Sequence, residues 1–134
     1  MSGRVTERSL QKQRFEATRF PDEVYTGLIG LLNRSGGEPV GGTCIHLMSG
    51  YGHLSAKLAR AWNCRIVAIE PDDRIRSEAA RRNAYSSLIY MKADETRLPL
   101  QDHEAAALIA MQASVRVSNL ERLVEEMMRT LSPG

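Results

Sequence analysis

Two glycines, Gly50 and Gly52, separate an apolar run over residues 44–48 from a segment in which Leu54 and Leu58 recur at helical spacing. A strand that passes through a glycine turn into a helix brings backbone N–H groups and a helix N-terminus close to a nucleotide-like ligand. A Cβ at either glycine would hinder close approach of the ligand or forbid the turn's dihedral angles. The pattern indicates a ligand-binding turn, although a plain surface turn has the same short signature.

Acidic residues follow the next two apolar runs. Glu70 ends the run 66–69, twenty residues after Gly50, and the run 88–91 leads to Asp94. An acid about 20 residues beyond such a glycine turn is placed to meet the ribose hydroxyls of a nucleotide. Three strand ends that carry glycines, a glutamate and an aspartate in that order are more specific than any one of them.

Further apolar patterns predict the elements that position these ends. A helix opens at Pro21-Asp22-Glu23, another covers 54–62, and a third starts at Pro71-Asp72-Asp73. The run 105–111 is apolar throughout, as in a parallel strand covered on both faces, although its alanines would equally permit a helix. A last helix begins with a capping box in which Ser118 is the N-cap and Glu121 the third residue. The side chains expected to face the core from these helices are Val24, Leu28, Leu31, Leu32, Ile75, Ala79, Ala80, Leu120, Leu123, Val124, Met127 and Leu131.

The first residues are polar and charged, and they predict an N-terminal arm over 1–18 that is partly disordered or helical. Residues 19–134 then form a single domain. Phe15, Arg19 and Phe20 are candidates for a lid over a bound ligand, with simple packing against the sheet as the alternative.

From residue 19 to residue 134 the chain resembles the class I S-adenosylmethionine-dependent methyltransferases. The segment His46-Leu47-Met48-Ser49-Gly50-Tyr51-Gly52 stands where that family commonly has Asp-Leu-Gly-Cys-Gly-Thr-Gly. The resemblance implies a Rossmann-like, doubly wound α/β fold with helices on both faces of a mainly parallel sheet, in strand order 3-2-1-4 and without the family's last three strands. It also implies S-adenosylmethionine as cofactor, bound by Ser49, Gly50, Gly52, Glu70, Pro71, Asp94, Glu95, Met111 and Gln112.

The glycine motif departs from the family at two positions. His46 replaces the family's acid, and Met48 replaces its first glycine. A methionine side chain at that position could fill the space that the cofactor's methionine end would use. This departure supports an alternative: a methyltransferase-fold protein without methyl transfer, either a regulatory subunit or half of a split enzyme.

Methyl transfer from a sulfonium needs mainly alignment of the acceptor with the methyl carbon, so no fixed catalytic residue is demanded. His53, directly after Gly52, is the nearest candidate for a general base. His46, His53 and His103 lack the spacing and partners of a metal site, so no metal is predicted.

Composition limits the remaining classes. A formal net charge of +2 and scattered arginines do not favour a nucleic-acid surface, and no apolar run reaches membrane-spanning length. Cys44 and Cys64 are expected to be free thiols in a reducing, cytoplasmic environment. The strand 105–111 would be an exposed sheet edge, which predicts a homodimer or another chain that covers it. The predicted function is methyl transfer to a small-molecule acceptor.

Overall fold

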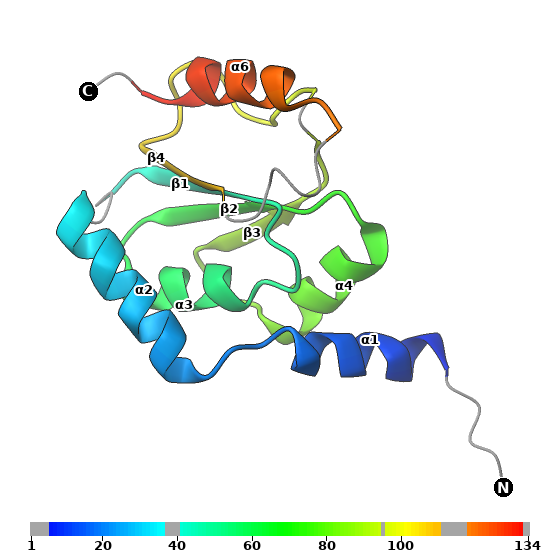
Figure 1. The fold of residues 1–134 in the computed structure, drawn as a ribbon. Coiled ribbons are helices and arrows are strands. Elements are labelled where there is room, and N and C mark those ends of the chain that lie inside the picture. Colours follow the sequence, from blue (N-terminus) through cyan, green and yellow to red (C-terminus); the bar gives the residue numbers. More distant parts are fainter. Residues whose placement is uncertain (1–5, 37–40, 95, 111–117, 133–134) are drawn as a thin grey trace, which may run out of the picture.

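The computed structural model describes residues 6–36, 41–94, 96–110 and 118–132. Four strands form one sheet, and helices lie on both of its faces (Figure 1). The elements are α1 (Glu7–Ala17), α2 (Asp22–Ser35), β1 (Thr43–Leu47), α3 (His53–Ala61), β2 (Arg65–Ile69), α4 (Asp73–Arg82), β3 (Leu88–Met91), β4 (Ala107–Ala110) and α6 (Leu120–Thr130).

The strand order β3-β2-β1-β4, with every neighbouring pair parallel, confirms the predicted sheet. Ile45 of β1 lies between Val67 of β2 and Leu108 of β4, which fixes the register at the centre. The fourth strand starts at Ala107, two residues later than predicted, and Ala105 instead forms a bridge with Leu131 after α6. Met111, the predicted end of the strand, lies outside the described residues.

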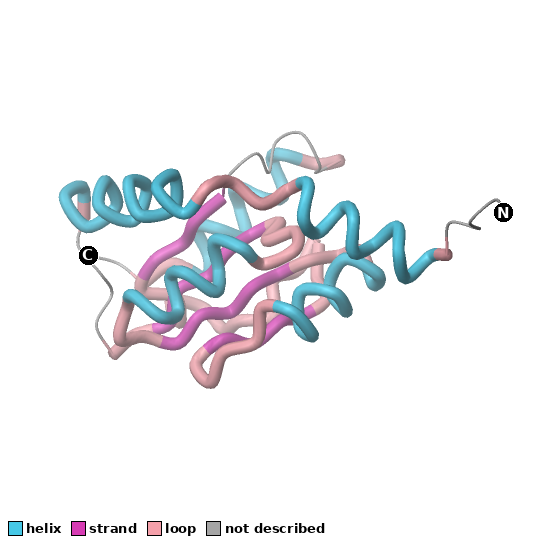
Figure 2. The backbone as a smooth tube through the Cα atoms, turned by 90° about the horizontal axis from the view of Figure 1, so that it is seen from below, coloured by secondary structure: helices cyan, strands magenta, loops and turns pink. Residues whose placement is uncertain are grey.

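Alternate residues of the central strands face opposite cores, as expected for a sheet that is covered on both sides. Cys44 and Ile66 face a core built with α2 and α3, whereas Ile45 and Val67 face a core built with α6 and residues 98–105. Figure 2, turned from the first view, shows helices packed across the strands. Both cysteines are buried thiols outside any disulfide, as predicted, and burial raises the pKa of Cys44 to about 12.

Side-chain caps fix two helix starts, one of them differently from the prediction. The Asp72 carboxylate accepts hydrogen bonds from the backbone N–H groups of Arg74 and Ile75, so α4 begins as expected. The cap of α6 is Asn119, whose side chain accepts the N–H of Arg122; the prediction of Ser118 as N-cap is wrong by one residue.

The helices bury narrower apolar stripes than their sequences suggested. Among the residues expected in the core, Val24, Leu31, Leu120 and Val124 are 48–53% exposed, and Ala80 is also exposed. In α6 the buried side is formed by Leu123, Met127 and the following Leu131, while the neighbouring stripe of Leu120, Val124 and Met128 faces outward. Tyr25, which the prediction omitted, is the buried residue of α2.

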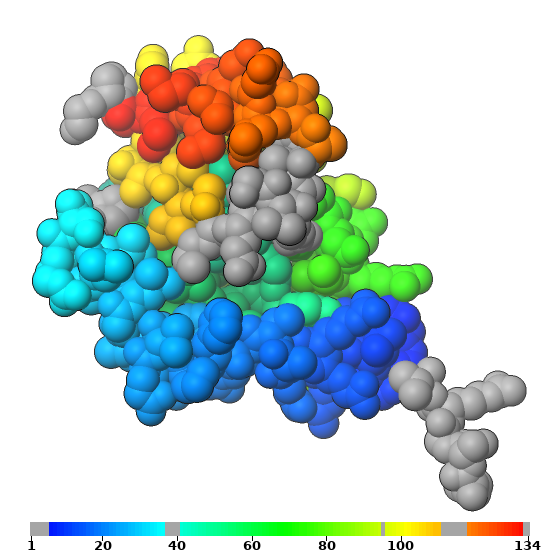
Figure 3. Space-filling model, viewed as in Figure 1, coloured from blue at the N-terminus to red at the C-terminus, as the bar shows by residue number. Residues whose placement is uncertain are grey.

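The N-terminal residues 7–17 are helical and contact the glycine turn. The Tyr51 hydroxyl donates to Gln11 Oε1 at 2.7 Å, and the Phe15 ring packs edge-on against Tyr51 and His53. Arg74 of α4 forms an ion pair with Glu7 at 3.2 Å. In the surface view, α1 and α2 follow one another along one side of the molecule (Figure 3).

Candidate functional site

A cavity of about 450 Å³ opens beside the glycine turn, where β1 ends. One wall comes from β1, the turn and the start of α3; the other comes from the segment 18–28, which includes the first half of α2. The lining residues are Thr18, Phe20, Val24, Tyr25, Leu28, His46, Met48, Ser49, Gly50, Tyr51, His53, Leu54 and Ile75.

Both glycines of the turn have left-handed backbone angles, with φ +61° at Gly50 and +82° at Gly52. An added Cβ at Gly50 would meet nothing within 4 Å, so this glycine leaves open space on the cavity wall. An added Cβ at Gly52 would collide with the phenol of Tyr90, whose hydroxyl donates to the Asn83 carbonyl. Gly50 is thus adapted to leave a space open and Gly52 to tight internal packing.

Glu70 lies at the tip of β2 as predicted and is fully buried. Its Oε1 accepts the backbone N–H of Gly50 at 2.9 Å, and its Oε2 accepts that of Asp72, also at 2.9 Å. The carboxylate therefore joins the glycine turn to the start of α4. Glu70 is not among the residues that line the cavity.

Met48 combines a left-handed backbone, φ +50°, with a buried side chain. Such an angle is uncommon for a residue other than glycine, asparagine or aspartate, and costs about 1–2 kcal/mol. The residue lines the cavity and also packs in the core with Leu47 and Leu98. The chain thus keeps a glycine-type backbone at this position while placing a large side chain there.

His46 is buried, and its Nδ1 is 2.5 Å from the Ser55 hydroxyl oxygen. Burial lowers the pKa of His46 to about 4, so the ring is neutral at physiological pH. The residue lines the cavity, but it supplies an uncharged ring where an acid would have supplied a fixed negative charge.

His53 has protein partners on both ring nitrogens. Its Nε2 donates to the Phe15 carbonyl at 2.8 Å, and its Nδ1 lies 3.2 Å from the Asn83 side-chain amide, which donates to it. Burial lowers the pKa of His53. This arrangement fixes the neutral ring between α1 and the end of α4, and it leaves neither nitrogen unpaired for proton transfer.

Of the remaining predicted site residues, Ser49 lines the cavity, whereas Pro71 and Asp94 are not among its lining residues. Ser49 is buried and its hydroxyl donates to the Ile69 carbonyl at 3.4 Å; Pro71 is half-buried beside Glu70. Asp94 is exposed after β3, and its Oδ1 accepts the backbone N–H of Thr96 at 2.9 Å. Glu95, Met111 and Gln112 lie outside the described residues.

The sequence indicated the cavity wall from segment 18–28 only in part. Of the three lid candidates, Phe20 lines the cavity, whereas Phe15 and Arg19 are not among its lining residues. Tyr25 carried no signal beyond its position in a helix. The Tyr25 hydroxyl accepts the Phe20 N–H at 3.1 Å and fixes the entry into α2.

A larger cavity, of about 880 Å³, lies at the N-terminal ends of the strands, opposite the glycine turn. It is lined by residues such as Thr43, Arg65 and Ser87 at the strand N-termini, and by no residue that the glycine and acid pattern singles out. In open α/β sheets ligands bind at the carboxyl ends of the strands, so the smaller cavity is the better candidate.

The described residues hold neither a metal-binding cluster nor a membrane-spanning helix. No group of three or more histidine, cysteine, aspartate and glutamate side chains there could hold a metal ion. No helix within the same residues has the length and apolarity needed to cross a membrane.

A four-stranded parallel sheet with a glycine turn after its first strand and a buried acid after its second defines a Rossmann-like domain of the nucleotide-binding type. Residues 45–134, more than half of the chain, match the family described as "Methyltransferase domain". The chain belongs to this family, the class I S-adenosylmethionine-dependent methyltransferases, whose cofactor is S-adenosylmethionine.

Individual relatives are distant and longer. The sterol 24-C-methyltransferase erg6 of Schizosaccharomyces pombe is 26% identical over 108 residues, which are 78% of this chain and 28% of that enzyme. A structure assigned as an S-adenosylmethionine-dependent methyltransferase of Methanococcus maripaludis superimposes with a TM-score of 0.81 at 22% identity, covering 100% of this chain and 64% of that one. A Haloferax volcanii protein, assigned as a methyltransferase and solved in complex with the Trm112 methyltransferase activator, gives 0.66 at 22% identity, with 72% and 44% covered. At 22% identity these two structures establish the fold alone.

Proposed function

We propose that this chain binds S-adenosylmethionine at the glycine-turn cavity and forms the cofactor-binding part of an enzyme that transfers its methyl group to a small-molecule acceptor. The observation that carries the proposal is Gly50: it lines the cavity, has a left-handed backbone and leaves open space where a Cβ would stand. A ligand can therefore approach the main chain closely at this point.

We assign a group of residues to each of the cofactor's three parts. Ser49, Gly50 and Gly52 shape the turn against which the methionine end would lie, with Met48 beside it. Glu70 and the adjacent Pro71 stand at the β2 tip, where ribose hydroxyls would donate to the carboxylate. Asp94 stands after β3, where an adenine amino group would donate to it. Glu95, Met111 and Gln112 complete the proposed set from the sequence pattern.

The ribose contact requires a local shift of the turn. Glu70 is fully buried, and each of its oxygens already accepts one backbone N–H. Ribose hydroxyls would therefore reach the carboxylate only when the turn moves aside, and they would then donate to its oxygens.

When bound, the cofactor supplies a methyl group on a sulfonium, and the chain's contribution is alignment and exclusion of water. Phe20, Val24 and Leu28 give the cavity an apolar wall that would screen the transfer. His53, committed on both nitrogens, acts as a positioning residue that joins α1 to the turn.

Met48 supports a second candidate, a methyltransferase-fold protein that does not transfer methyl groups. Its side chain lies in the cavity wall where the family has glycine. If this side chain closes the site to the cofactor's methionine end, the chain would act as a regulatory subunit or would complete a partner's enzyme.

Partner binding is a further part of the proposal. β4 borders the described sheet, and it reaches the molecular surface between α2 and α6 (Figure 3, yellow to orange). Apolar edge strands are usually paired or covered, so we expect a second copy or another chain to cover it. The complex of the H. volcanii relative with its activator is consistent with such a partner. Light scattering of the purified chain tests the second copy; a monomer would contradict it and leave another chain as the covering partner.

Titration calorimetry with S-adenosylhomocysteine and S-adenosylmethionine tests cofactor binding. We expect micromolar dissociation constants, weakened about tenfold or more in Gly50→Ala, because the new methyl group enters the cavity. Gly41→Ala is the matched control, since Gly41 also has a left-handed backbone, φ +74°, and its added Cβ also meets nothing within 4 Å, but it lies before β1 and does not line this cavity. Absence of binding by the unmodified chain would favour the second candidate.

A further inference from the structure

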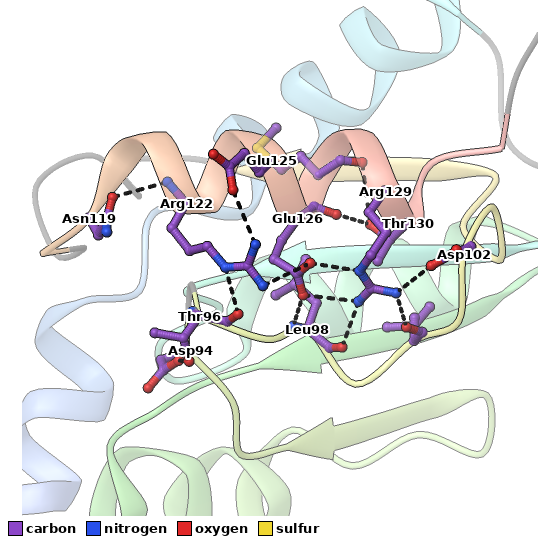
Figure 4. A network of polar contacts seen from close by, with 12 residues as sticks. Asp94, Thr96, Leu98, Asp102, Asn119, Arg122, Glu125, Glu126, Arg129 and Thr130 are labelled. Carbon is purple, nitrogen blue, oxygen red and sulfur yellow. Dashed lines mark hydrogen bonds and ion pairs between the residues drawn. The ribbon is translucent and has the colours of Figure 1, made fainter.

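Charged side chains of α6 form hydrogen bonds with the backbone of the loop that follows β3 (Figure 4). Glu126 is only 1% exposed, and its Oε1 accepts the backbone N–H of Leu98 at 2.7 Å. A helix glutamate thus binds the main chain of a loop 28 residues earlier. Charge-assisted hydrogen bonds of this kind are stronger than neutral ones.

Arg129, one helical turn further, forms three more hydrogen bonds with the same loop. Its guanidinium donates to the carbonyls of Leu98 at 3.1 Å and Leu100 at 2.8 Å, and to Asp102 at 3.0 Å. It also pairs with Glu126, with Nε at 2.6 Å from Oε2 and Nη2 at 2.9 Å from Oε1. Its hydrogen bonds lower the pKa of Glu126 to about 2, so the pair stays charged at neutral pH.

Arg122 adds a hydrogen bond nearer to the β3 end of the loop. Its Nε donates to the Thr96 carbonyl at 2.9 Å, and Thr96 in turn donates its N–H and hydroxyl to Oδ1 of Asp94. Residues 122, 126 and 129 lie on one side of the helix, so their side chains reach the loop together. The contacts form a continuous path from α6 to Asp94.

This path fixes the direction of the Asp94 carboxylate, on which the proposed ligand binding depends. Oδ1 is committed to Thr96, and Oδ2 has no hydrogen bond from the described residues. Oδ2 is therefore the oxygen left to accept a ligand's amino group, and its direction depends on the backbone that α6 holds.

We propose that Glu126, Arg129 and Arg122 are positioning residues that set recognition of the cofactor's adenine through residues 96–100 and Asp94. They do so without touching the cofactor, and the inference rests on the proposed function. A network that only stabilised the fold would alter the melting temperature and leave ligand preference unchanged. A positioning network alters the preference for the adenine amino group itself.

The test compares two probes: S-adenosylhomocysteine and its inosine analogue, in which oxygen replaces the adenine amino group. We expect the unmodified chain to prefer S-adenosylhomocysteine, because Asp94 accepts from the amino group and repels the oxygen. Asp94→Asn measures how much of the preference this carboxylate provides. Glu126→Gln should abolish most of that preference and weaken S-adenosylhomocysteine by about tenfold or more, since a small misplacement is costly in a defined site.

Glu121→Gln is the control, an exposed residue of the same helix outside the network. Circular dichroism reports whether each variant folds. If Glu126→Gln does not, Arg122→Gln carries the test, because the Arg122 side chain is 38% exposed and its loss leaves the Glu126–Arg129 pair in place. Hydrogen exchange of the Leu98 and Thr96 amides should accelerate in these variants.

Folded Glu126→Gln and Arg122→Gln variants that keep the preference of the unmodified chain would overturn the positioning role alone. If the unmodified chain binds S-adenosylhomocysteine without preference, the adenine role of Asp94 fails and the inference fails with it. If it binds neither probe, the proposed function itself is overturned.

Discussion

The Glu70 carboxylate accepts the backbone N–H of Gly50 at 2.9 Å, joining the tip of β2 to the turn after β1. Its second oxygen accepts the N–H of Asp72, so one buried side chain satisfies donors from two different turns. The two residues that the sequence pattern paired by spacing are therefore in direct contact. The contact makes Glu70 part of the fold as well as of the proposed site.

Replacing this carboxylate should destabilise the protein. Glu70→Ala leaves the N–H groups of Gly50 and Asp72 without their acceptor, and each unsatisfied buried donor costs about 1–3 kcal/mol. We expect the free energy of unfolding in urea to fall by about 3 kcal/mol. Glu23→Ala, an exposed change on α2, is the control. A loss below about 0.5 kcal/mol, typical of a surface substitution, would show that the contact is not important for stability.

The two glycines should separate folding from binding. Gly52→Ala places a methyl group against the Tyr90 phenol at φ +82°, and the strain and overpacking should cost about 3 kcal/mol or more. Gly50→Ala meets open space, so only its backbone angle opposes the change, at about 1–2 kcal/mol. Thermal unfolding measures the difference. Equal losses in the two variants would contradict the assignment of Gly52 to packing and Gly50 to the cavity.

Met48→Gly should increase affinity for S-adenosylhomocysteine, by about tenfold if the side chain costs roughly 1.4 kcal/mol of binding free energy. The protein should become less stable, because a buried side chain worth about 1.5–3 kcal/mol is lost and relief of the φ +50° backbone returns only about 1–2 kcal/mol. Calorimetry measures the affinity, with Met48→Leu as the control that keeps the volume. Unchanged or weaker binding in Met48→Gly would show that this side chain does not obstruct the cavity.

His46 predicts a pH dependence of stability. Its pKa of about 4 in the folded chain lies below its unfolded value of about 6.5, so the unfolded state binds the proton more readily. The contribution of His46 is complete above pH 6.5 and is lost as the pH falls towards 4, by about 3 kcal/mol at most.

Urea unfolding of His46→Asn between pH 7 and 4 isolates this effect by difference from the unmodified chain. The variant should lose less stability across that range than the unmodified chain. Parallel profiles for His46→Asn and the unmodified chain would contradict the burial argument.

The parallel sheet could be predicted from apolar runs separated by helical patterns, and the family resemblance supplied the strand order. The exposed fractions of the helix side chains could not be predicted from the sequence. Apolar residues such as Leu120 and Val124 recur at helical spacing, but how wide a stripe is covered depends on what packs against it. The cap of α6 was misplaced because Ser118 and Asn119 are both good N-caps and only the geometry separates them.

The site was predictable only where spacing along the sequence determines it. Spacing placed Gly50 and Glu70 at neighbouring strand ends, which needs only the period of a strand–helix–strand unit. Other features depend on contacts between segments distant in sequence. These are the cavity wall from Phe20 to Leu28 and the hydrogen bond from the Leu98 N–H to Glu126. The backbone angle of Met48 likewise belongs to the folded turn and not to its residue type.

The most direct test of the cavity assignment is an NMR titration of the isotopically labelled chain with S-adenosylhomocysteine. We expect large, saturable shifts for the backbone amides of Gly50 and Gly52, with smaller ones at Asp94 and Phe20, and little change at Thr43 or Ser87 near the strand N-termini. Shifts concentrated near the strand N-termini, or no shifts at any ligand concentration, would contradict binding at the glycine-turn cavity.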